Sequence, residues 1–313
     1  MSRTAAFACA AAVLFALCTS PAGAADALTG RLTGVGSDTA SALVARWADA
    51  FRAEHPRVQV QVQAAGSASA PTALVEGAAD FGSMSRPMSE TENAAFHARY
   101  GYDPTRVVVA HDAIAVFVHP ENPLERITLA QLDAIYSADR RCGAAVPVRE
   151  WRDLGVAADP ALAAARVLAS GRNEASGTYE VFREGALCRG NYRADVVAWP
   201  GNGAVVATVA THREAIGYAG LGYVTGLVKP LALARGDGDE AVTPDRAAVT
   251  QGRYPLSRAL YLYVNRPPGS ALADLPAAFL AYALSDAGQA LAQREGFTPL
   301  QANERAAQRA LLE

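Results

Sequence analysis

The stretch LTGVGSDTASALVARWADAF, residues 32–51, contains the pattern that decides the fold. Residues 30–35 are predicted to form a strand. Residues 39–55 are predicted to form a helix, because apolar side chains recur at helical spacing along one face. The Gly-Ser-Asp-Thr turn at 36–39 lies between them. A strand, a Gly/Ser turn and an amphipathic helix together make one unit of an α/β protein.

The same unit recurs along the chain. Val58–Val62 alternates as a half-buried strand should, and a helix is expected near 70–78. Further strands are predicted at 107–110, 113–119 and 165–170, further helices at 128–136 and 177–187, and a helix followed by a strand within 201–224. Strands that alternate with helices favour parallel sheets covered on both faces. The predicted fold class is therefore α/β.

Three loops before predicted helices share a composition. They are GSDT at 36–39, GSAS at 66–69 and ASGT at 175–178. A helix start offers unpaired N–H groups and the positive end of the helix dipole, and adjacent hydroxyls add neutral donors. One such loop is typically an N-cap that binds nothing else. Three of them, with Arg172 nearby, predict an anion site at the carboxyl ends of the strands.

The first 24 residues have the features of a secretory signal peptide. Arg3 is followed by an apolar run from Ala5 to Leu17 and by Ala22-Gly23-Ala24. The run is shorter than the roughly 20 residues of a spanning helix, and the bulky Leu17 before Cys18 argues against a lipid anchor. We expect a mature protein outside the cytoplasm, periplasmic or otherwise secreted. Its size suggests two domains or one large α/β unit.

Charge and cysteine content narrow the function classes. The formal net charge is −3, with both signs interspersed, so no nucleic-acid partner is expected. The five histidines form no pair at metal-ligand spacing, and we expect no metal or other cofactor. Cys142 and Cys188 remain after signal removal, in a compartment that permits oxidation. A Cys142–Cys188 disulfide is predicted, with two separate thiols as the alternative.

The order and spacing of these motifs resemble the periplasmic phosphate-binding proteins that serve ABC-type phosphate importers. The resemblance covers nearly the whole mature chain. Its motifs include QAAGSASAPTALVEGAADFGSMSRPM (63–88), VVAHDAIAVFVHPENPL (108–124), ITLAQLDAIYS (127–137), REWRDLG (149–155), GRNEASGTYEVF (171–182), IGYAGLGYV (216–224) and YPLSRALYLYVN (254–265), besides the opening stretch.

The resemblance implies a type II periplasmic binding protein fold, in which two α/β lobes are joined by two crossing strands and enclose a ligand cleft. Lobe I would comprise residues 25–113 plus 225–313, and lobe II residues 114–224. The crossings would fall near 112–116 and 217–223. Both cysteines would then lie in lobe II, so that a disulfide leaves the hinge free. A monomer is expected.

The resemblance also implies which residues bind phosphate. They are Ser37, Asp38 and Thr39 of the first loop, Ser67 of the second, Ser85, Arg172, and Ser176, Gly177 and Thr178 of the third. Arg172 would supply the full positive charge, since its planar fork matches two phosphate oxygens. Glu174 would orient Arg172 or stay solvated. Arg86 would add to the positive field or pair with Asp38 or another acid that closes the lobes.

One position departs from the family pattern. Many relatives carry an aspartate where Ser85 stands, and that carboxylate accepts the proton which phosphate still carries near neutral pH. Asp38 stands where those relatives have a neutral hydroxyl residue, so the acceptor is expected to have changed loops; the alternative is a simple helix cap. Sulfate has no proton to donate, and a buried acceptor facing it would reject it by about 10⁴-fold or more.

The predicted function is the capture of inorganic phosphate and its presentation to the membrane permease of an ABC importer, with no enzymatic step. Another tetrahedral oxyanion, such as sulfate, molybdate or tungstate, is the alternative within the class. A secreted phosphatase is disfavoured because the adjacent His111 and Asp112 of a predicted strand point to opposite faces, and no GxSxG elbow is present. A surface adhesin on the same fold is the remaining alternative.

Overall fold

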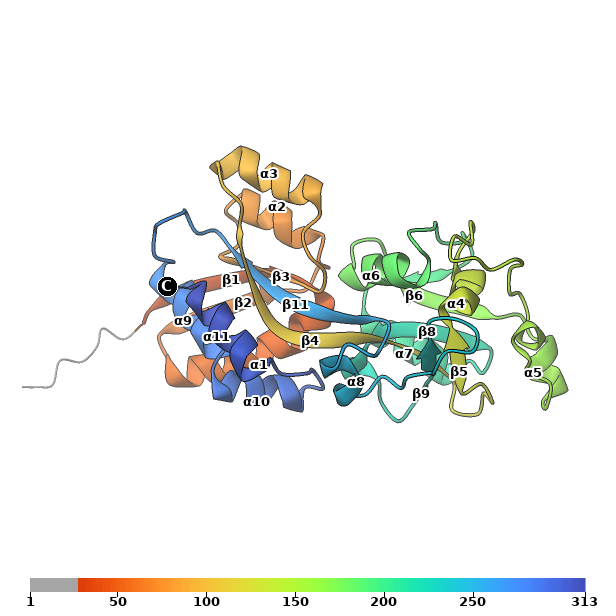
Figure 1. Cartoon of the computed structure of the whole chain (residues 1–313). Helices are drawn as coiled ribbons and strands as arrows, with labels where there is room; N and C mark the ends of the chain where they lie inside the picture. Colours follow the sequence, from red (N-terminus) through yellow and green to blue (C-terminus); the bar gives the residue numbers. More distant parts are fainter. Residues whose placement is uncertain (1–27, 313) are drawn as a thin grey trace, which may run out of the picture.

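The computed structural model describes residues 28–312, and the predicted signal peptide at 1–24 lies outside them. Two α/β lobes lie side by side (Figure 1). Within the described residues, nine strands form one sheet with the main order β2-β1-β3-β11-β4-β8-β6-β7, and β9 pairs with β4. The α/β fold with two lobes confirms the predicted fold class.

The first lobe is built on five strands. They are β1 (Gly30–Gly36), β2 (Val58–Gln63), β3 (Phe81–Met84), β11 (Ser257–Val264) and the first part of β4 (Thr105–Val118). β1 is parallel to β2 and β3, whereas β11 is antiparallel to β3 and β4. The carboxyl ends of β1 and β3 therefore meet at one edge of the sheet, where the first-lobe loops that carry Ser37 and Ser85 begin.

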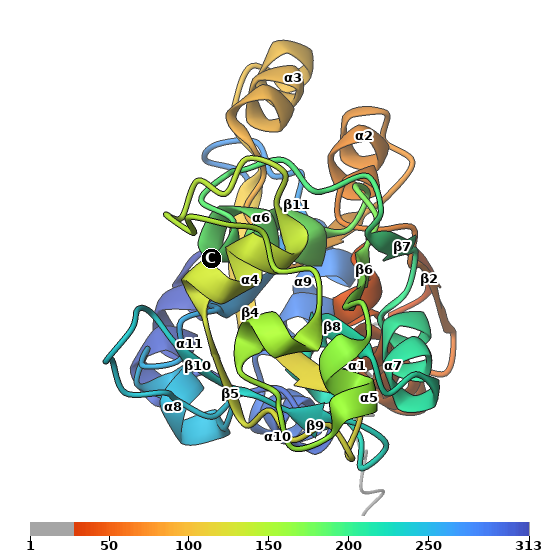
Figure 2. The same cartoon turned by 90° about the vertical axis from the view of Figure 1, so that its right-hand side faces the viewer.

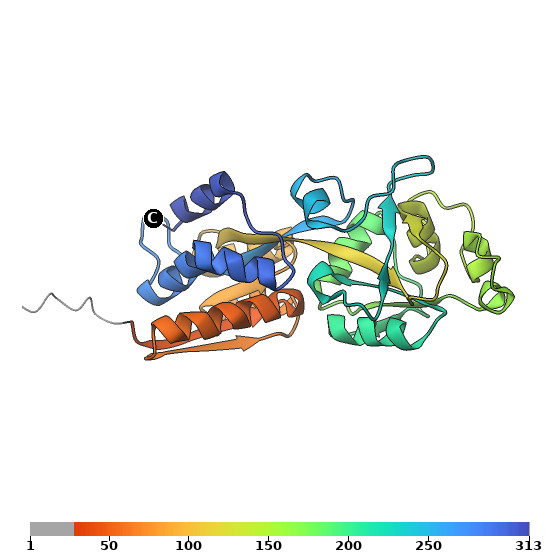
Figure 3. The same cartoon turned by 90° about the horizontal axis from the view of Figure 1, so that it is seen from below.

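Helices cover both faces of this sheet. The helices α1 (Asp38–Glu54), α9 (Asp274–Ala283), α10 (Asp286–Arg294) and α11 (Ala302–Ala310) lie on one side, and α2 (Ser69–Val75) and α3 (Glu90–Tyr100) lie on the other (Figures 1 and 3). Trp47, Phe51 and Phe279 are buried in the core on the α1 side. Leu74 and Phe96 are buried on the α2 side. This burial of apolar surface fixes the orientation of α1, whose N-terminus faces the second lobe.

The second lobe uses the rest of the sheet. Its strands are the end of β4, β8 (Ala215–Gly220), β6 (Leu168–Arg172), β7 (Val197–Trp199) and β9 (Lys229–Pro230), with a separate pair β5 (Arg126–Thr128) and β10 (Ala232–Ala234). Its helices are α4 (Leu129–Tyr136), α5 (Pro160–Ala164), α6 (Gly177–Ala186), α7 (Asn202–Thr211) and α8 (Arg246–Thr250), with 3-10 turns η1 (Trp151–Leu154) and η2 (Leu221–Tyr223). Figure 2 shows α4 and α6 on the opposite side of this sheet from α7.

The strand β4 joins the two lobes. It pairs with β11 as far as Ala113 and with β8 from Ile114 onward, so the crossing near 112–116 lies within one long strand (Figure 3). The other expected crossing, at 217–223, instead includes most of β8, which pairs with the second-lobe part of β4.

Residues 225–256 pack with the second lobe. Leu231, Leu233, Ala248, Tyr254 and Leu256 are buried in the same core as Tyr136, Trp151 and Phe182. This packing favours a boundary at about residue 256 rather than at 224, because these apolar side chains have their partners in the second lobe. We therefore propose lobe limits of 28–113 plus 257–312 for the first lobe and 114–256 for the second.

The disulfide predicted from the sequence is present. Cys142 and Cys188 are bonded, with their Cα atoms 5.3 Å apart. The bond joins the segment after α4 to the end of α6, so it lies within the second lobe. Over residues 28–312, no helix is long and apolar enough to cross a membrane.

Candidate anion-binding site

The three Gly/Ser-rich loops meet between the lobes. The hydroxyl oxygens of Thr39 from the first loop and Thr178 from the third are 2.9 Å apart. The backbone N–H of Ala68 in the second loop donates to the carbonyl of Ala175 in the third, at 3.1 Å. Two loops of the first lobe thus contact one loop of the second.

Glycines permit this close approach. At Gly177, a Cβ atom would lie 2.5 Å from Oγ of Ser67 and 2.7 Å from Oγ of Ser85. Gly36 has a φ of 145°, and a Cβ there would lie 2.0 Å from the carbonyl oxygen of Ser83. A side chain at either position would push the loops apart. The structure therefore needs glycine at both positions to bring the hydroxyl groups together.

Two helices begin at this meeting point. Ser37 caps α1 by accepting from the N–H of Ala40, and Ser176 caps α6 by accepting from the N–H of Thr178. These two serines are therefore N-caps, as the simplest interpretation of such loops expects. Ser67 and Ser85 instead lie 3.2 Å apart through their hydroxyl oxygens and are fully buried. The positive ends of α1 and α6 both face the site.

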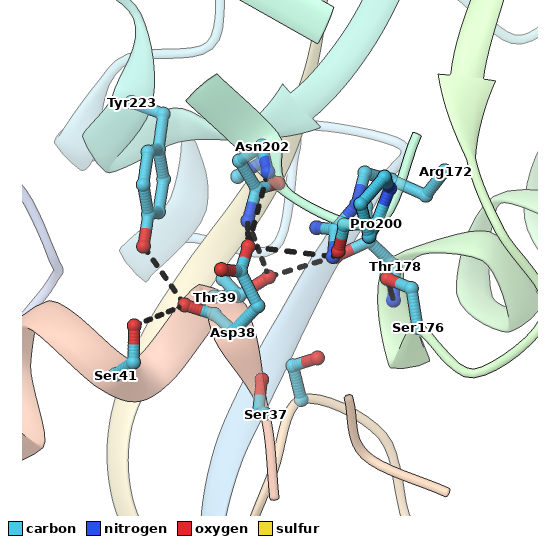
Figure 4. Close-up of polar contacts among 12 residues, drawn as sticks. Ser37, Asp38, Thr39, Ser41, Arg172, Ser176, Thr178, Pro200, Asn202 and Tyr223 are labelled. Carbon is cyan, nitrogen blue, oxygen red and sulfur yellow. Dashed lines mark hydrogen bonds and ion pairs between the residues drawn. The ribbon is translucent and has the colours of Figure 1, made fainter. Parts of the chain in front are cut away.

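Arg172 stands at the end of β6 and is 1% exposed. Its Nη2 lies 3.3 Å from Oδ2 of Asp38 and donates to the carbonyl of Pro200 at 2.6 Å (Figure 4). Its Nε and Nη1 are buried without a hydrogen-bond partner among residues 28–312. Burial lowers the pKa of Arg172; Asp38 opposes this shift and Arg258 adds to it. A buried guanidinium with two free donors suits an anionic ligand.

Asp38 links the lobes. Its Oδ2 accepts from the backbone N–H of Asn202 at 3.0 Å and from the side-chain amide of Asn202 at 2.7 Å. The hydroxyl of Tyr223 donates to the backbone carbonyl of Asp38 at 2.8 Å. All three donors belong to the second lobe, whereas Asp38 is the first residue of α1 (Figure 4).

The two supporting residues lie elsewhere. Arg86 forms a two-point ion pair with Glu92 of α3, with both N–O distances 2.6 Å. This partner belongs to its own lobe, so Arg86 pairs with neither Asp38 nor an acid that closes the lobes. Glu174 is exposed beside a cavity of about 640 Å³, and the ion pair of Arg172 is formed with Asp38 instead.

A second cation lies in the site, at a position that was not predicted from the sequence. Arg258 is 8% exposed and donates through Nε and Nη2 to Oδ2 of Asp112, at 2.9 and 2.7 Å. Its Nη1 donates to the hydroxyl of Thr178 at 2.9 Å. Arg258 and Asp112 are register partners on β11 and β4. The charge of Arg258 within an otherwise uncharged strand is the sequence signal that could have revealed it.

The hydroxyl groups of the site are arranged as donors. Thr178 accepts from Arg258 at 2.9 Å, and Thr39 accepts from the side-chain amide of Asn202 at 3.2 Å. Arginine and amide NH₂ groups can only donate, so each hydroxyl accepts one such bond. One hydroxyl hydrogen is used in the 2.9 Å bond between Thr39 and Thr178, and the other is left to donate. The site therefore presents hydrogen-bond donors to its centre, which suits a ligand with several acceptor oxygens. No group of His, Cys, Asp or Glu within residues 28–312 is placed to hold a metal ion.

Two α/β lobes joined by long strands, with a polar donor-lined site between them, define the class of bilobed solute-binding proteins. A family model described as a PBP superfamily domain matches residues 21–287. The phosphate-binding protein PstS of Pseudomonas aeruginosa is 45% identical over 278 residues, which cover 89% of this chain and 85% of that protein. The protein SphX of Synechococcus elongatus is 30% identical over 275 residues, covering 87% and 78%.

The fold is also found among solved structures. A Clostridium perfringens protein, assigned as a phosphate ABC transporter substrate-binding protein and solved with bound phosphate, aligns with a TM-score of 0.71. It is 24% identical, and the alignment covers 87% of this chain and 100% of that one. At this identity the likeness shows the fold alone. The family model and the P. aeruginosa relative establish that the chain belongs to the PstS family of the PBP superfamily.

Proposed function

We propose that this protein captures inorganic phosphate between its two lobes outside the cytoplasm and presents it to the permease of an ABC importer. The 45% identical relative from P. aeruginosa is a phosphate-binding protein, which supports phosphate as the ligand. The observation that carries the proposal is the pair of buried Arg172 nitrogens without hydrogen-bond partners among residues 28–312. The same guanidinium contacts Asp38, the residue before Thr39. The predicted signal peptide supports the location.

Binding proceeds by lobe closure and involves no covalent step. Phosphate oxygens accept from Nε and Nη1 of Arg172, from the hydroxyl pair of Thr39 and Thr178, and from N–H groups at the start of α6. Because these donors come from both lobes, the anion binds the closed arrangement more tightly than the open one, and this differential affinity drives closure. The importer then distinguishes the closed form from the open form.

Selection of phosphate over sulfate requires an acceptor for the phosphate proton. Ser85 is neutral, so the acceptor has to come from elsewhere. In this proposal Asp38 accepts the phosphate proton, through the carboxylate oxygen that is not bonded to Asn202. Oδ1 of Asp112 is a second acceptor nearby, since it is buried without a hydrogen-bond partner in the part of the chain that the structure describes.

Calorimetric titration of the mature protein with phosphate and with sulfate, at pH 6 and pH 8, tests the proposal. We expect phosphate to bind at both values and sulfate to bind far more weakly, because sulfate would bring lone pairs against a buried carboxylate. Equal affinity for the two anions would contradict the acceptor role. Absence of phosphate binding under all conditions would contradict the proposed function itself.

A further inference from the structure

The helix α7 begins at Asn202 and follows Gly201, which has no side chain to cap it. Its first N–H donates instead to the carboxylate of Asp38, which belongs to the other lobe. We propose that Asp38 and Asn202 form a cap between the lobes that holds them closed, so that Asn202 is a positioning residue for ligand capture. This inference rests on the proposed function and adds a residue to it.

The side-chain amide of Asn202 makes three hydrogen bonds. Its side chain is 0% exposed, and its Oδ1 accepts from the backbone N–H of Gly220 at 3.1 Å. That bond fixes the amide so that Nδ2 faces the first lobe, where it donates to Asp38 at 2.7 Å and to Thr39 at 3.2 Å. Asn202 therefore fixes the position of the Asp38 carboxylate and also that of the Thr39 hydroxyl in the anion site.

The charge arrangement favours this cap. A carboxylate at a helix N-terminus interacts favourably with the helix dipole, and α7 has no acidic residue in its own first turn. The carboxylate of Asp38 takes that place in trans, close to Arg172. When the lobes separate, Asp38 leaves α7 and these donors return to water. The cap thus stabilises the closed arrangement specifically.

A contact of this kind acts on every ligand equally. Apparent affinity is the intrinsic affinity multiplied by the fraction of molecules in the binding-competent state. Removal of the Asn202 amide lowers that fraction, while every side chain that donates to the anion stays in place. The affinities for phosphate and sulfate should then fall by the same factor, and their ratio should stay constant. An acceptor of the phosphate proton behaves in the opposite way, because its removal changes the ratio.

The first experiment compares Asn202→Ala with Asn303→Ala, a change of an exposed asparagine on α11. We expect Asn202→Ala to weaken phosphate binding about tenfold, or 1.4 kcal/mol, and to weaken sulfate equally when sulfate is measured by competition. Small-angle scattering of the phosphate-free variant should give a larger radius of gyration than the wild type. Asn303→Ala should change neither quantity.

An exchange of the two groups separates the cap from a folding defect. Asp38→Asn and Asn202→Asp should each weaken phosphate binding, the second because it sets two carboxylates against each other. In the phosphate-free double variant the radius of gyration should return most of the way to the wild-type value, since the amide at position 38 donates to the carboxylate at position 202. That carboxylate still accepts from Gly220. Circular dichroism confirms that each variant is folded.

Three outcomes would overturn the cap: unchanged phosphate affinity in Asn202→Ala, an unchanged radius of gyration, or no recovery of that radius in the double variant. A collapse of the phosphate-to-sulfate ratio in Asn202→Ala would also overturn it, because Asn202 would then discriminate between the two anions instead of only holding the lobes together. Failure of the proposed function looks different, since the wild type itself would not bind phosphate. Scattering without ligand tests the cap even in that case.

Discussion

The end of β6 and the paired strands β4 and β11 each place an arginine in the site, in contrasting surroundings. Arg258 gives four of its bonds to side-chain oxygens, two of them to the buried carboxylate of Asp112 and one each to Thr178 and Thr39. Arg172 has an ion pair of 3.3 Å with Asp38 and leaves Nε and Nη1 buried and unpaired within the described residues. The charge of Arg258 is thus compensated by the protein, and that of Arg172 only in part.

This difference suggests a structural role for Arg258 and a ligand-binding role for Arg172. Removal of one partner of a buried ion pair lowers the stability of the protein strongly, because the other charge then stays buried without compensation. Donors left unpaired cost free energy in the ligand-free protein and regain it when an anion arrives. We therefore assign Arg258 chiefly to the joint between the lobes and Arg172 chiefly to the ligand.

The largest effect is expected for Arg258→Met on the free energy of unfolding. The change leaves the carboxylate of Asp112 buried without its cation, which costs about 3–5 kcal/mol. Urea denaturation followed by circular dichroism measures this loss. The double variant with Asp112→Asn should recover much of it, because no charge then stays buried. A loss below about 1 kcal/mol would mean that the two arginines are equivalent.

Arg172→Ala should show the reverse pattern. We expect phosphate affinity to fall by at least about 30-fold, because truncation of one partner of a buried charge pair costs about 2–5 kcal/mol. The free energy of unfolding should change little, since two of its donors have no partner to lose. Calorimetry and urea denaturation of the same preparation measure both quantities. A fall in affinity below about tenfold would place the anion away from Arg172.

Short-range sequence patterns predicted the role of Arg172 but not that of Arg258. Arg172 and the Ser-Gly-Thr turn lie within seven residues, so composition alone indicated their cooperation. Arg258 and Asp112 are 146 residues apart, and their contact depends on the register of β4 against β11. Register depends on the packing of a whole sheet, which one sequence does not determine. Asn202 was missed for the same reason, because its partner lies in the other lobe.

The lobe boundary, too, depends on contacts between distant residues that the sequence alone does not determine. Residues 107–110 and 113–119 were predicted as two strands, because the polar pair His111-Asp112 interrupts the apolar pattern. They form the single strand β4, in which Arg258 compensates the charge of Asp112. Between residues 225 and 256 the structure has only short elements, β9, β10 and α8, whose periodic signal is weak. Their apolar side chains gave no indication of which lobe would bury them.

Gly177→Ala tests whether the third loop must approach the first lobe closely. The new methyl group would lie 2.5 Å from Oγ of Ser67, and such overpacking costs about 1–3 kcal/mol. The cost falls on the closed arrangement, so phosphate affinity should drop about tenfold. Gly203→Ala is the matched control, since its Cβ meets no atom within 4 Å. Equal affinities of the two variants would show that closure does not bring the third loop against Ser67.

The smallest effect is expected for Tyr218→Phe. This variant tests whether the backbone position of Arg172 or its guanidinium nitrogens control binding. The Tyr218 hydroxyl accepts from the backbone N–H of Arg172 at 3.3 Å and lies 2.8 Å from the hydroxyl of Tyr192. Its ring stacks on Phe182, with centroids 3.8 Å apart.

Phenylalanine keeps that stacking and removes the hydroxyl with its bonds to the Arg172 N–H and to Tyr192. The unfolding free energy should therefore fall by about 1 kcal/mol for each bond lost. Phosphate affinity should fall less than tenfold, because the guanidinium keeps its bond to Pro200. The same calorimetric titration measures this change. If the loss matched that of Arg172→Ala, the position of the backbone, rather than the unpaired guanidinium nitrogens, would control binding at this end of the site.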